Sequence, residues 1–244
     1  MKILLTDKVP QFFEEGLQER NFDLIYRKGI SHDQLSEEIS EYDALVIRSN
    51  SRIDTEVLSN ANRLKYILRP GSGLENVNLE LARKMGVQVI SSPEGNRNAV
   101  AEHALGLLLN LLNNICRSHN EILEGHWKRE ENRGRELSSL KVGIIGYGNT
   151  GKAFAMKLGP LCKQVLVYDK YKSGFGNERV KEVALEDLHE ETDVLSVHLP
   201  LNNETKYLLN SNFLTNFHKE IVLLNTSRGE ILRTVDLIEL LNGG

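Results

Sequence analysis

Short apolar runs alternate with longer amphipathic stretches over the first ninety residues. The apolar runs have the length and composition of strands, whereas in the stretches between them apolar side chains recur every three or four residues, as on one face of a helix. The strand-like runs are KILLT, FDLIY, DALVIRS, KYILRP and VQVISS, and the helix-like stretches are PQFFEEGLQER, SHDQLSEEIS, DTEVLSN and NLELARKMG. This alternation predicts an α/β domain with a mainly parallel sheet, in which Ser31 caps one helix and Gly86 ends another.

The most apolar segment of the chain lies between Ala99 and Cys116. Charged and amide side chains interrupt it, so the pattern indicates a buried or interface helix rather than a membrane span. We predict one long helix from about Asn98 to His119, followed by the polar stretch EGHWKREENRGREL. The boundary between two domains is expected near residue 93, with a first domain over 1–93 and a second over 94–244.

Three glycines follow the apolar run of residues 141–145. Gly146, Gly148 and Gly151 have the GxGxxG spacing, and a helix-like stretch continues after them. In a strand–turn–helix unit the first glycine permits a tight turn, the second lets a diphosphate approach the backbone, and the third lets the helix pack on the strand. The free N–H groups at the start of that helix attract anions. The segment therefore predicts a site for the diphosphate of a dinucleotide.

An acidic residue closes the next predicted strand, Val165 to Tyr168. Asp169 lies 18 residues after Gly151, close to the roughly 20 expected for the acid that binds the adenosine ribose hydroxyls. A carboxylate at this place would repel a 2′-phosphate. The pattern therefore favours NAD over NADP.

Beyond Asp169 the alternation of strands and helices resumes. DVLSVHLP and IVLLNTSRG are predicted as strands with their turns, and ALEDLHEE, residues 211–216 and TVDLIELLN as helices. These segments predict four strands of a doubly wound parallel sheet of the Rossmann type. Because such a sheet usually has six strands, we expect this domain to be incomplete at its C-terminal end.

Composition excludes several classes of function. Charged residues make up 26% of the 244 residues and the net charge is -4, which is typical of a soluble globular protein without general attraction for nucleic acid or anionic membranes. Cys116 and Cys162 lie in unrelated segments, so neither a disulfide framework nor a metal site is indicated. The first apolar run is too short for a signal peptide, and a cytoplasmic location is expected.

Residues just after the strands are the candidates for chemistry, because ligands of open α/β sheets bind beyond the carboxyl ends of the strands. Four such places are Arg48-Ser49, Arg69 to Gly73, His198 to Pro200 and Asn225 to Gly229. Arg228 is the first choice for holding an anionic substrate, since its planar fork suits a carboxylate; the alternative is an arginine paired with a nearby acid. The loop around Ser72 is either an anion-binding loop or an ordinary turn.

Histidine is the usual proton donor to a carbonyl that is reduced by hydride. Of the seven histidines, His198 is the best placed, because it directly follows a strand. A histidine there is more often a support for the site than an acid. The sequence offers no convincing general acid.

Four segments together resemble the D-isomer-specific 2-hydroxyacid dehydrogenases. They are RPGSGLENVNLELARKMGVQVISSPEGNRNAVAEHALGLLLNL, GIIGYGNTG, VHLPL and NTSRG, in this order. The resemblance implies that the first domain binds substrate and the second binds NAD, both with doubly wound parallel sheets of the flavodoxin or Rossmann type. It also implies a homodimer that pairs through the long helix.

The resemblance assigns roles to individual residues. Arg228 would bind the substrate carboxylate and polarise its carbonyl, and Ser72 and Gly73 would line the substrate and nicotinamide side. Arg48 and Ser49 match positions that contact a phosphate-bearing substrate. The remaining cofactor contacts that it implies are Asn96 in the hinge between domains, Asn149 and Thr150 at the diphosphate, Asp169 at the ribose, and Leu199, Thr226 and Ser227.

The implied reaction interconverts a 2-hydroxy acid and its 2-oxo acid, with 3-phosphoglycerate as the leading substrate and glyoxylate or hydroxypyruvate reduction next. The family's catalytic glutamate and histidine would fall after Gly244, so the chain as given is expected to be inactive or nearly so. A rival interpretation is a binding protein that senses NAD without catalysis. An SAM-dependent transferase with the same glycine turn is disfavoured, because NTSRG and the tandem domain would have no role in it.

Overall fold

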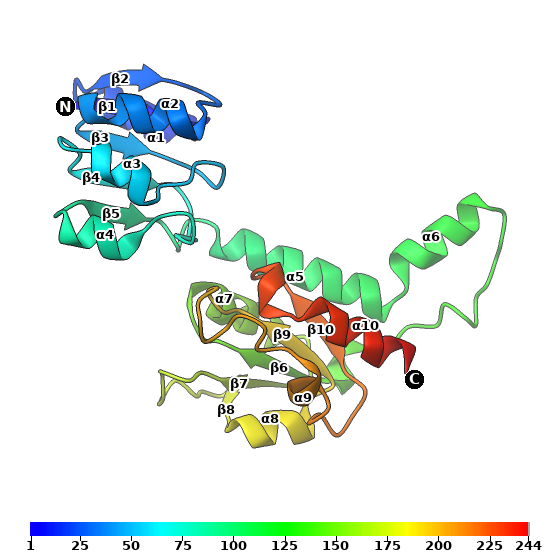
Figure 1. Cartoon of the computed structure of the whole chain (residues 1–244). Coiled ribbons are helices and arrows are strands. Elements are labelled where there is room, and N and C mark those ends of the chain that lie inside the picture. Colours follow the sequence, from blue (N-terminus) through cyan, green and yellow to red (C-terminus); the bar gives the residue numbers. More distant parts are fainter. Residues whose placement is uncertain (244) are drawn as a thin grey trace. The chain divides into compact units, whose positions relative to one another are not determined.

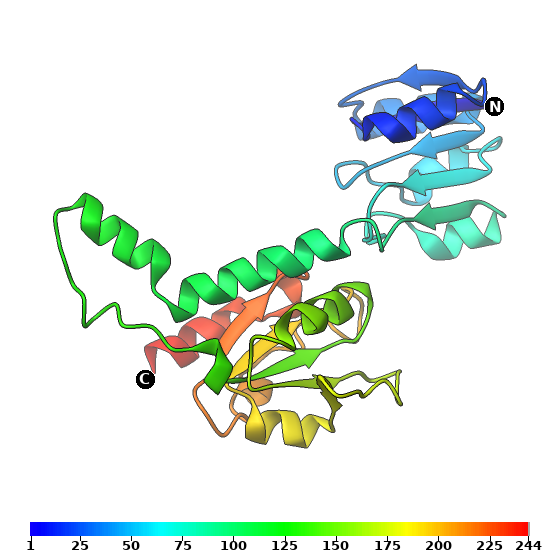
Figure 2. The same cartoon turned by 180° about the vertical axis from the view of Figure 1, so that it is seen from behind.

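The computed structural model describes residues 1–243 and forms two compact units. The first unit is Met1–Asn96, and the second begins at Arg97. In each of them a parallel sheet has helices on both faces, as Figures 1 and 2 show. This is the tandem arrangement of doubly wound domains that the alternating pattern predicts.

The first unit contains a five-stranded sheet within residues 1–96, in the order β2-β1-β3-β4-β5. All of its strand pairs are parallel. The strands are β1 (Lys2–Leu5), β2 (Asp23–Tyr26), β3 (Ala44–Val46), β4 (Tyr66–Arg69) and β5 (Gln88–Ser91). This is the flavodoxin-like strand order, whose ligand crevice lies where the order reverses, between β1 and β3.

Helices cover both faces of the first sheet. They are α1 (Gln11–Gln18), α2 (His32–Glu38), α3 (Thr55–Asn60), α4 (Leu79–Lys84) and the 3-10 helix η1 (Ile39–Glu41). Leu4, Leu45 and Ile67 pack with side chains from α2 and α3 on one face, and Ile3 and Leu5 pack with side chains from α1 on the other. Successive strand residues point to opposite faces, so both faces of a central strand must be apolar.

Sequence signals at helix ends are confirmed in this unit. Ser31 accepts a hydrogen bond from the Gln34 N–H, and the Gln34 side chain accepts one from the Ser31 N–H, which is a complete capping box. Gly86 follows α4 with a φ of +74°, the left-handed conformation that glycine adopts at little cost after a helix.

The second unit has a five-stranded parallel sheet within residues 97–243, in the order β10-β9-β6-β7-β8. Its strands are β6 (Lys141–Ile145), β7 (Gln164–Tyr168), β8 (Val180–Glu182), β9 (Val194–Val197) and β10 (Val222–Asn225). The prediction of four strands is therefore wrong: β8, which pairs only with β7, was missed. Counted from β6, the order 3-2-1-4-5 is that of a Rossmann sheet.

Helices cover both faces of this second sheet. The helices of the unit are α5 (Arg97–Leu112), α6 (Ile115–Leu123), α7 (Asn149–Leu158), α8 (Leu185–Glu191), α9 (Ser211–Leu214), α10 (Thr234–Asn242) and the 3-10 helices η2 (Leu137–Ser139) and η3 (Gly229–Ile231). Of these, α6 has no buried residue and extends away from the sheet (Figure 1). One face of the sheet packs with α5 and α7, around Leu108, Ile144 and Phe154. Leu188 of α8 packs on the other face, against Leu166.

The prediction of a single long helix from Asn98 to His119 is wrong, because this segment forms two helices, α5 and α6. Asn114, between the two, has a φ of +53°, and the helices are bent by 60°. Two hydrogen bonds stabilise the break: the Arg135 N–H, from a later segment, donates to the Leu112 carbonyl at 2.9 Å, and the Cys116 N–H of α6 donates to Asn110 Oδ1 of α5 at 2.8 Å. Asparagine tolerates the left-handed conformation better than most residues.

Of the helices described in residues 1–243, none is by itself both long and apolar enough to cross a membrane, and the only candidate by length and composition is the bent pair α5 and α6.

Candidate dinucleotide-binding site

The glycine turn joins β6 to α7 and depends on close backbone approach. Gly146 has a φ of +96°, and a Cβ added to it would lie 2.4 Å from the His198 carbonyl oxygen. A Cβ added to Gly151 would lie 2.0 Å from the Gly146 carbonyl oxygen. Because these neighbours are backbone atoms, neither position has room for a side chain. The first and third glycines thus have the structural roles that the spacing predicts.

Gly148 differs from the other two glycines. It is the N-cap of α7 and has an extended conformation, and a Cβ added to it would meet no described heavy atom within 4 Å. Asn149 and Thr150 follow as the first residues of α7, whose first turn carries no acidic side chain. The backbone here is open to a ligand on the side where the N–H groups of the helix start are free, which suits an anion.

Asp169 follows β7 and accepts three backbone hydrogen bonds. The Tyr147 N–H donates to Oδ2 at 2.7 Å, and the N–H groups of Tyr171 and Lys172 donate to Oδ1 at 2.9 and 3.0 Å. Partial burial disfavours the charged form of this carboxyl, but the three donors outweigh that effect and lower its pKa. Asp169 is therefore an anion at neutral pH, as the predicted preference for NAD requires.

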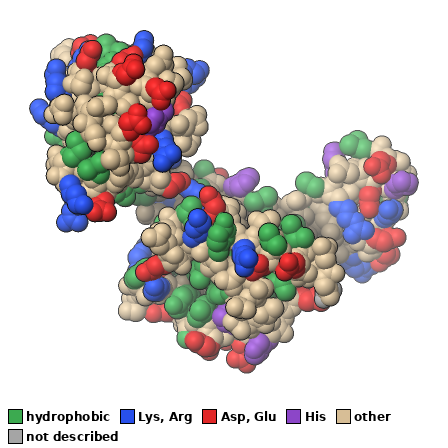
Figure 3. All heavy atoms as spheres, viewed as in Figure 1, with side chains coloured by type: hydrophobic (Ala, Val, Ile, Leu, Met, Phe, Trp, Pro, Cys, Tyr) green, Lys and Arg blue, Asp and Glu red, His purple; other side chains and the backbone are tan. Residues whose placement is uncertain are grey.

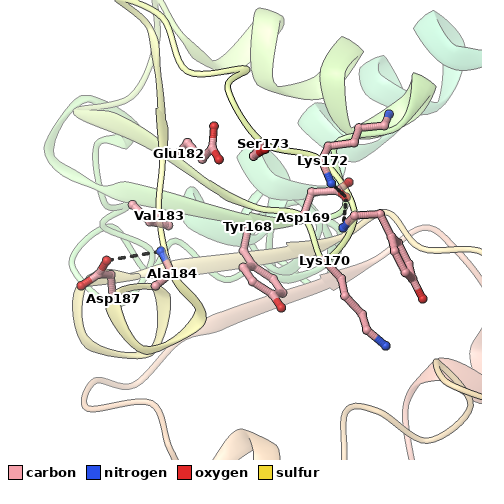
Figure 4. A pocket seen from close by; sticks show the side chains of 10 residues that line it. Tyr168, Asp169, Lys170, Lys172, Ser173, Glu182, Val183, Ala184 and Asp187 are labelled. Carbon is pink, nitrogen blue, oxygen red and sulfur yellow. Dashed lines mark hydrogen bonds between the residues drawn. The ribbon is translucent and has the colours of Figure 1, made fainter.

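A pocket of about 610 Å³ opens beside this loop, at the carboxyl ends of β7 and β8. Figure 4 shows that the side chains of Tyr168 and Lys170 leave the loop in a different direction from that of Asp169. Glu182 and Asp187 lie on the far side of the same pocket. Asp169 is thus directed toward the glycine turn, where it accepts the Tyr147 N–H.

Tyr147 links the glycine turn to the loop after β7. Its ring is buried and stacks on Phe175 with the ring centroids 4.4 Å apart, and its carbonyl accepts a hydrogen bond from Lys172 Nζ at 2.8 Å. Together with the Tyr147 N–H on Asp169, these contacts fix the turn against the loop that would hold the ribose. Neither Tyr147 nor Lys172 could be recognised from the sequence, because their partners lie more than twenty residues away along the chain.

His198 lies inside the unit rather than at a reaction centre. Its side chain is 7% exposed, its Nε2 is 2.9 Å from Ser196 Oγ, and its ring packs on Phe154. Burial lowers the pKa of His198 to about 4, so the ring is neutral at pH 7. The structure gives His198 a supporting role behind the glycine turn, where its backbone carbonyl faces Gly146.

The loops after β9 and β10 are tied together by one hydroxyl. Ser227 Oγ donates to the Val197 carbonyl at 2.8 Å and accepts the Leu199 N–H at 3.1 Å. Thr226 Oγ1 is buried and has no hydrogen-bond partner within the described part of the chain. A buried hydroxyl of this kind can still bind a polar group of a ligand.

Arg228 lies at the end of the loop after β10, where hydrogen bonds with Asn225 hold the backbone. Its carbonyl accepts Asn225 Nδ2 at 2.8 Å, while Asn225 Oδ1 accepts the Ser227 N–H at 3.0 Å. The guanidinium of Arg228 is half-buried and donates from Nη1 to the Ser227 carbonyl at 2.8 Å. Asn225 thus shapes the loop that presents Arg228.

The predicted residues of the second unit share one edge of its sheet, since the carboxyl ends of parallel strands lie together. The ends of β6, β7, β9 and β10 carry, respectively, the glycine turn, Asp169, Leu199, and Thr226 to Arg228. Open space at Gly148, an ionised Asp169 and the unsatisfied Thr226 hydroxyl fit a dinucleotide with an unphosphorylated ribose. The role of each residue stays a prediction.

The predicted residues of the first unit lie at the carboxyl edge of its own sheet. Arg48 is exposed after β3 and donates from Nη1 to the Lys8 carbonyl at 3.3 Å. Ser49 is exposed beside it, and Ser72 and Gly73 are partly buried in the loop after β4. Asn96 borders a pocket of about 430 Å³ whose walls include the apolar side chains of Phe12, Phe13, Leu68 and Ile90.

Comparisons with known proteins agree with this geometry. The model of the family described as "D-isomer specific 2-hydroxyacid dehydrogenase, NAD binding domain" matches residues 105–244. The chain is 30% identical to the D-3-phosphoglycerate dehydrogenase of Archaeoglobus fulgidus over 246 residues, which is 100% of this chain and 47% of that protein. It is 31% identical to the hydroxypyruvate reductase of Thermotoga maritima over 200 residues, or 82% of this chain and 65% of that protein.

A solved structure, that of the TT0316 protein from Thermus thermophilus, has a TM-score of 0.88 at 30% identity over 99% of this chain and 78% of that one. The chain spans about half the length of the phosphoglycerate dehydrogenases that it matches, 47% in the case of the Archaeoglobus protein. The family match covers the glycine turn, Asp169 and the NTSRG loop, which are the residues of the site described above. The chain therefore belongs to the D-isomer-specific 2-hydroxyacid dehydrogenase family and contains that family's NAD-binding domain.

Proposed function

We propose that the protein is an NAD-dependent dehydrogenase that interconverts a D-2-hydroxy acid and its 2-oxo acid. The observation that carries the proposal is the carboxyl edge of the second sheet, where the open turn at Gly148, the anionic Asp169 and Arg228 are brought together. NAD would bind with its diphosphate at the start of α7 and its ribose on Asp169, and once bound it supplies the hydride acceptor.

Arg228 is the residue that we assign to the substrate carboxylate. Its guanidinium is half-buried, and the Asn225 contacts hold its backbone in one conformation. A planar donor fork at a fixed place binds a carboxylate through two parallel hydrogen bonds and also polarises an adjacent carbonyl. Ser72 and Gly73 would line the substrate and nicotinamide side, and Asn96 the hinge.

The leading substrate is 3-phosphoglycerate, oxidised to 3-phosphohydroxypyruvate as in serine biosynthesis. Arg48 supports this choice, because its guanidinium is exposed at the carboxyl edge of the first sheet, where it donates to the backbone carbonyl of Lys8. A guanidinium and the nearby Ser49 hydroxyl are groups that bind phosphate. The relatives that match the whole chain and bear the name D-3-phosphoglycerate dehydrogenase favour the same substrate.

A second candidate is an unphosphorylated acid, as in a glyoxylate or hydroxypyruvate reductase. The pocket beside Asn96 supports it, since Phe12, Leu68 and Ile90 give that pocket largely apolar walls. Apolar walls suit a small or apolar side chain and disfavour a phosphate.

The substrate is tested by measuring NADH formation by the complete product of the gene with 3-phosphoglycerate, D-glycerate and D-lactate. We expect kcat/KM for 3-phosphoglycerate to exceed the others by at least about tenfold, which corresponds to roughly 1.4 kcal/mol of transition-state stabilisation. If only the unphosphorylated acids react, the second candidate replaces the first. NADH binding without turnover of any acid would instead support a protein that senses NAD.

The role of Arg228 is tested by Arg228→Ala, with Arg233→Ala as the matched control. Arg233 lies five residues away, is itself largely exposed, and pairs with the buried carboxylate of Asp236. We expect Arg228→Ala to abolish turnover and leave the affinity for NADH largely intact, whereas Arg233→Ala should change neither. Normal turnover in Arg228→Ala would remove this residue from the mechanism.

We also propose that two copies of the chain pair through α5 and α6. Large apolar side chains are exposed along these helices and the segment after them, namely Leu111, Ile115, Ile122, Leu123 and Trp127. On the face shown in Figure 3, acidic and basic side chains are otherwise interspersed over the surface. Contiguous exposed apolar side chains mark protein interfaces. Sedimentation equilibrium should give a dimer mass, and a monomer at micromolar concentration would contradict the proposal.

A further inference from the structure

Two loops flank the glycine turn and are joined across it by one carboxylate. Because β6 lies between β7 and β9 in the sheet, the loops that follow β7 and β9 stand on either side of the turn. Lys170, in the first loop, pairs with Glu204, in the second, with Nζ 2.7 Å from Oε2. The Tyr171 hydroxyl donates to the same carboxylate. We call these three side chains the Glu204 bridge.

Each end of the Glu204 bridge stands on an ordered turn. On the β7 side, Asp169 accepts the N–H groups of Tyr171 and Lys172. On the β9 side, Asn202 Oδ1 accepts the Glu204 N–H at 2.9 Å and the Thr205 N–H at 3.0 Å. The bridge therefore joins two defined loops, and its side chains lose less freedom on pairing than they would on disordered segments.

The bridge is formed by charged groups at neutral pH. The hydrogen bond from Lys170 lowers the pKa of Glu204, and the same contact raises the pKa of Lys170. All three side chains are largely exposed, so solvent screens their pairing and it contributes little to the stability of the fold. The stability of the fold is thus a weak reason for this arrangement, and its position over the cofactor edge is the more informative feature.

A dinucleotide at the proposed cofactor site would carry its adenosine toward the two bridged loops. Its diphosphate would lie at Gly148 and the start of α7, and its ribose on Asp169. Asp169 directly precedes Lys170 and Tyr171 along the chain, so the adenosine would lie next to the side chains that pair with Glu204.

We propose that the Glu204 bridge closes over the adenosine half of the bound dinucleotide and slows its release. The inference rests on the proposed cofactor site and adds to it three residues that lie outside the glycine turn and the NTSRG loop. Once the bridge is formed, adenosine leaves only after the Lys170 and Tyr171 contacts to Glu204 break. Loss of the bridge therefore raises the dissociation rate constant.

The test is the release rate of NADH from Glu204→Gln, measured by stopped-flow displacement followed through NADH fluorescence. Glutamine has nearly the shape of glutamate but no charge to pair with Lys170. We expect release about fivefold faster than from the unsubstituted chain. Reduced nicotinamide mononucleotide, which lacks the adenosine, should bind both proteins equally. The matched control is Glu80→Gln, which removes another exposed ion pair, with Lys84 on the first unit, and should change neither the release of NADH nor the binding of the mononucleotide.

Exchanging the charges of Lys170 and Glu204 tests whether the effect comes from their ion pair. Lys170→Glu and Glu204→Lys should each speed the release of NADH, and the double variant should restore slow release. An unchanged NADH release rate in Glu204→Gln, or an equal change for reduced nicotinamide mononucleotide, would overturn the bridge. If the unsubstituted chain fails to bind NADH at all, the cofactor site itself fails, and that outcome is distinct from normal binding with an unaltered release rate.

Discussion

Substituting Gly148 by alanine separates the binding role of the glycine turn from its structural role. The backbone at Gly148 has a φ of -81° and a ψ of -160°, which alanine adopts without strain. The added methyl group would meet no described heavy atom within 4 Å. Replacing a glycine at a compatible position stabilises by about 0.4–1 kcal/mol. We therefore expect the free energy of unfolding of Gly148→Ala to stay within about 1 kcal/mol of the original.

The affinity for NADH should fall in the same variant. A diphosphate oxygen bound by the turn must approach a backbone nitrogen to about 2.9 Å, and the new methyl group occupies the space through which it approaches. A lost hydrogen bond to a charged group is worth about 1.5–3 kcal/mol. The dissociation constant for NADH should accordingly rise at least about tenfold, since 1.4 kcal/mol corresponds to a factor of ten.

Gly151→Ala is the comparison that fixes the interpretation. Its methyl carbon would lie 2.0 Å from the Gly146 carbonyl oxygen, and a backbone atom cannot move away as a flexible side chain can. Overpacking typically costs about 1–3 kcal/mol, and the gain in helix propensity returns at most about 1 kcal/mol. Gly151→Ala should thus lose both stability and affinity, whereas Gly148→Ala should lose affinity alone.

The assays are urea unfolding followed by circular dichroism and NADH titration followed by fluorescence, both on the 244-residue chain. The reasoning is refuted if Gly148→Ala binds NADH as tightly as the original. It is also refuted if Gly148→Ala is destabilised as much as Gly151→Ala, because the backbone at Gly148 would then have no room for a methyl group.

Three further substitutions test other parts of the account. Asp169→Asn should narrow the preference for NADH over NADPH, measured as the ratio of the two dissociation constants, because the repelling charge is lost; an unchanged ratio would argue against Asp169. Burial lowers the pKa of His198 to about 4 from about 6.5. Between these pH values the unfolded chain binds a proton at His198 that the folded chain does not, so the protein should lose about 3 kcal/mol of stability as the pH falls from about 6.5 to about 4. His198 should not affect the pH dependence of stability above pH about 6.5. In His198→Asn, the free energy of unfolding measured in urea should vary less with pH between about 4 and about 6.5 than in the original chain. The same pH dependence in both proteins would contradict the assignment. Asn114→Ala should lower the unfolding free energy by about 1 kcal/mol, since its left-handed backbone disfavours alanine, while Asn120→Ala, in the middle of α6, should have little effect.

Strand and helix order could be predicted because each buried element carries its own periodic pattern. The five strands of the first unit, within residues 1–96, and the glycine turn are confirmed on this basis. The missed strand β8 has three residues, only one of them buried, so its apolar pattern is too short to be recognised. Its backbone pairing with β7, which a single sequence does not encode locally, is what makes it a strand.

The break between α5 and α6 was missed for a related reason. The apolar pattern continues through it, and the contacts that hold it, such as the Arg135 N–H on the Leu112 carbonyl, come from a segment twenty residues later. In the site, the type and position of Asp169 were readable from the sequence. Its backbone partners and the Glu204 bridge were not, because they join loops that only the sheet order brings together.

The most direct measurement is a titration of the purified chain with NADH and, in parallel, with NADPH. Free amides at the start of α7 and an ionised Asp169 predict saturable binding of one NADH per chain, with NADPH at least about tenfold weaker. Failure to bind NADH, or tighter binding of NADPH, would contradict the account.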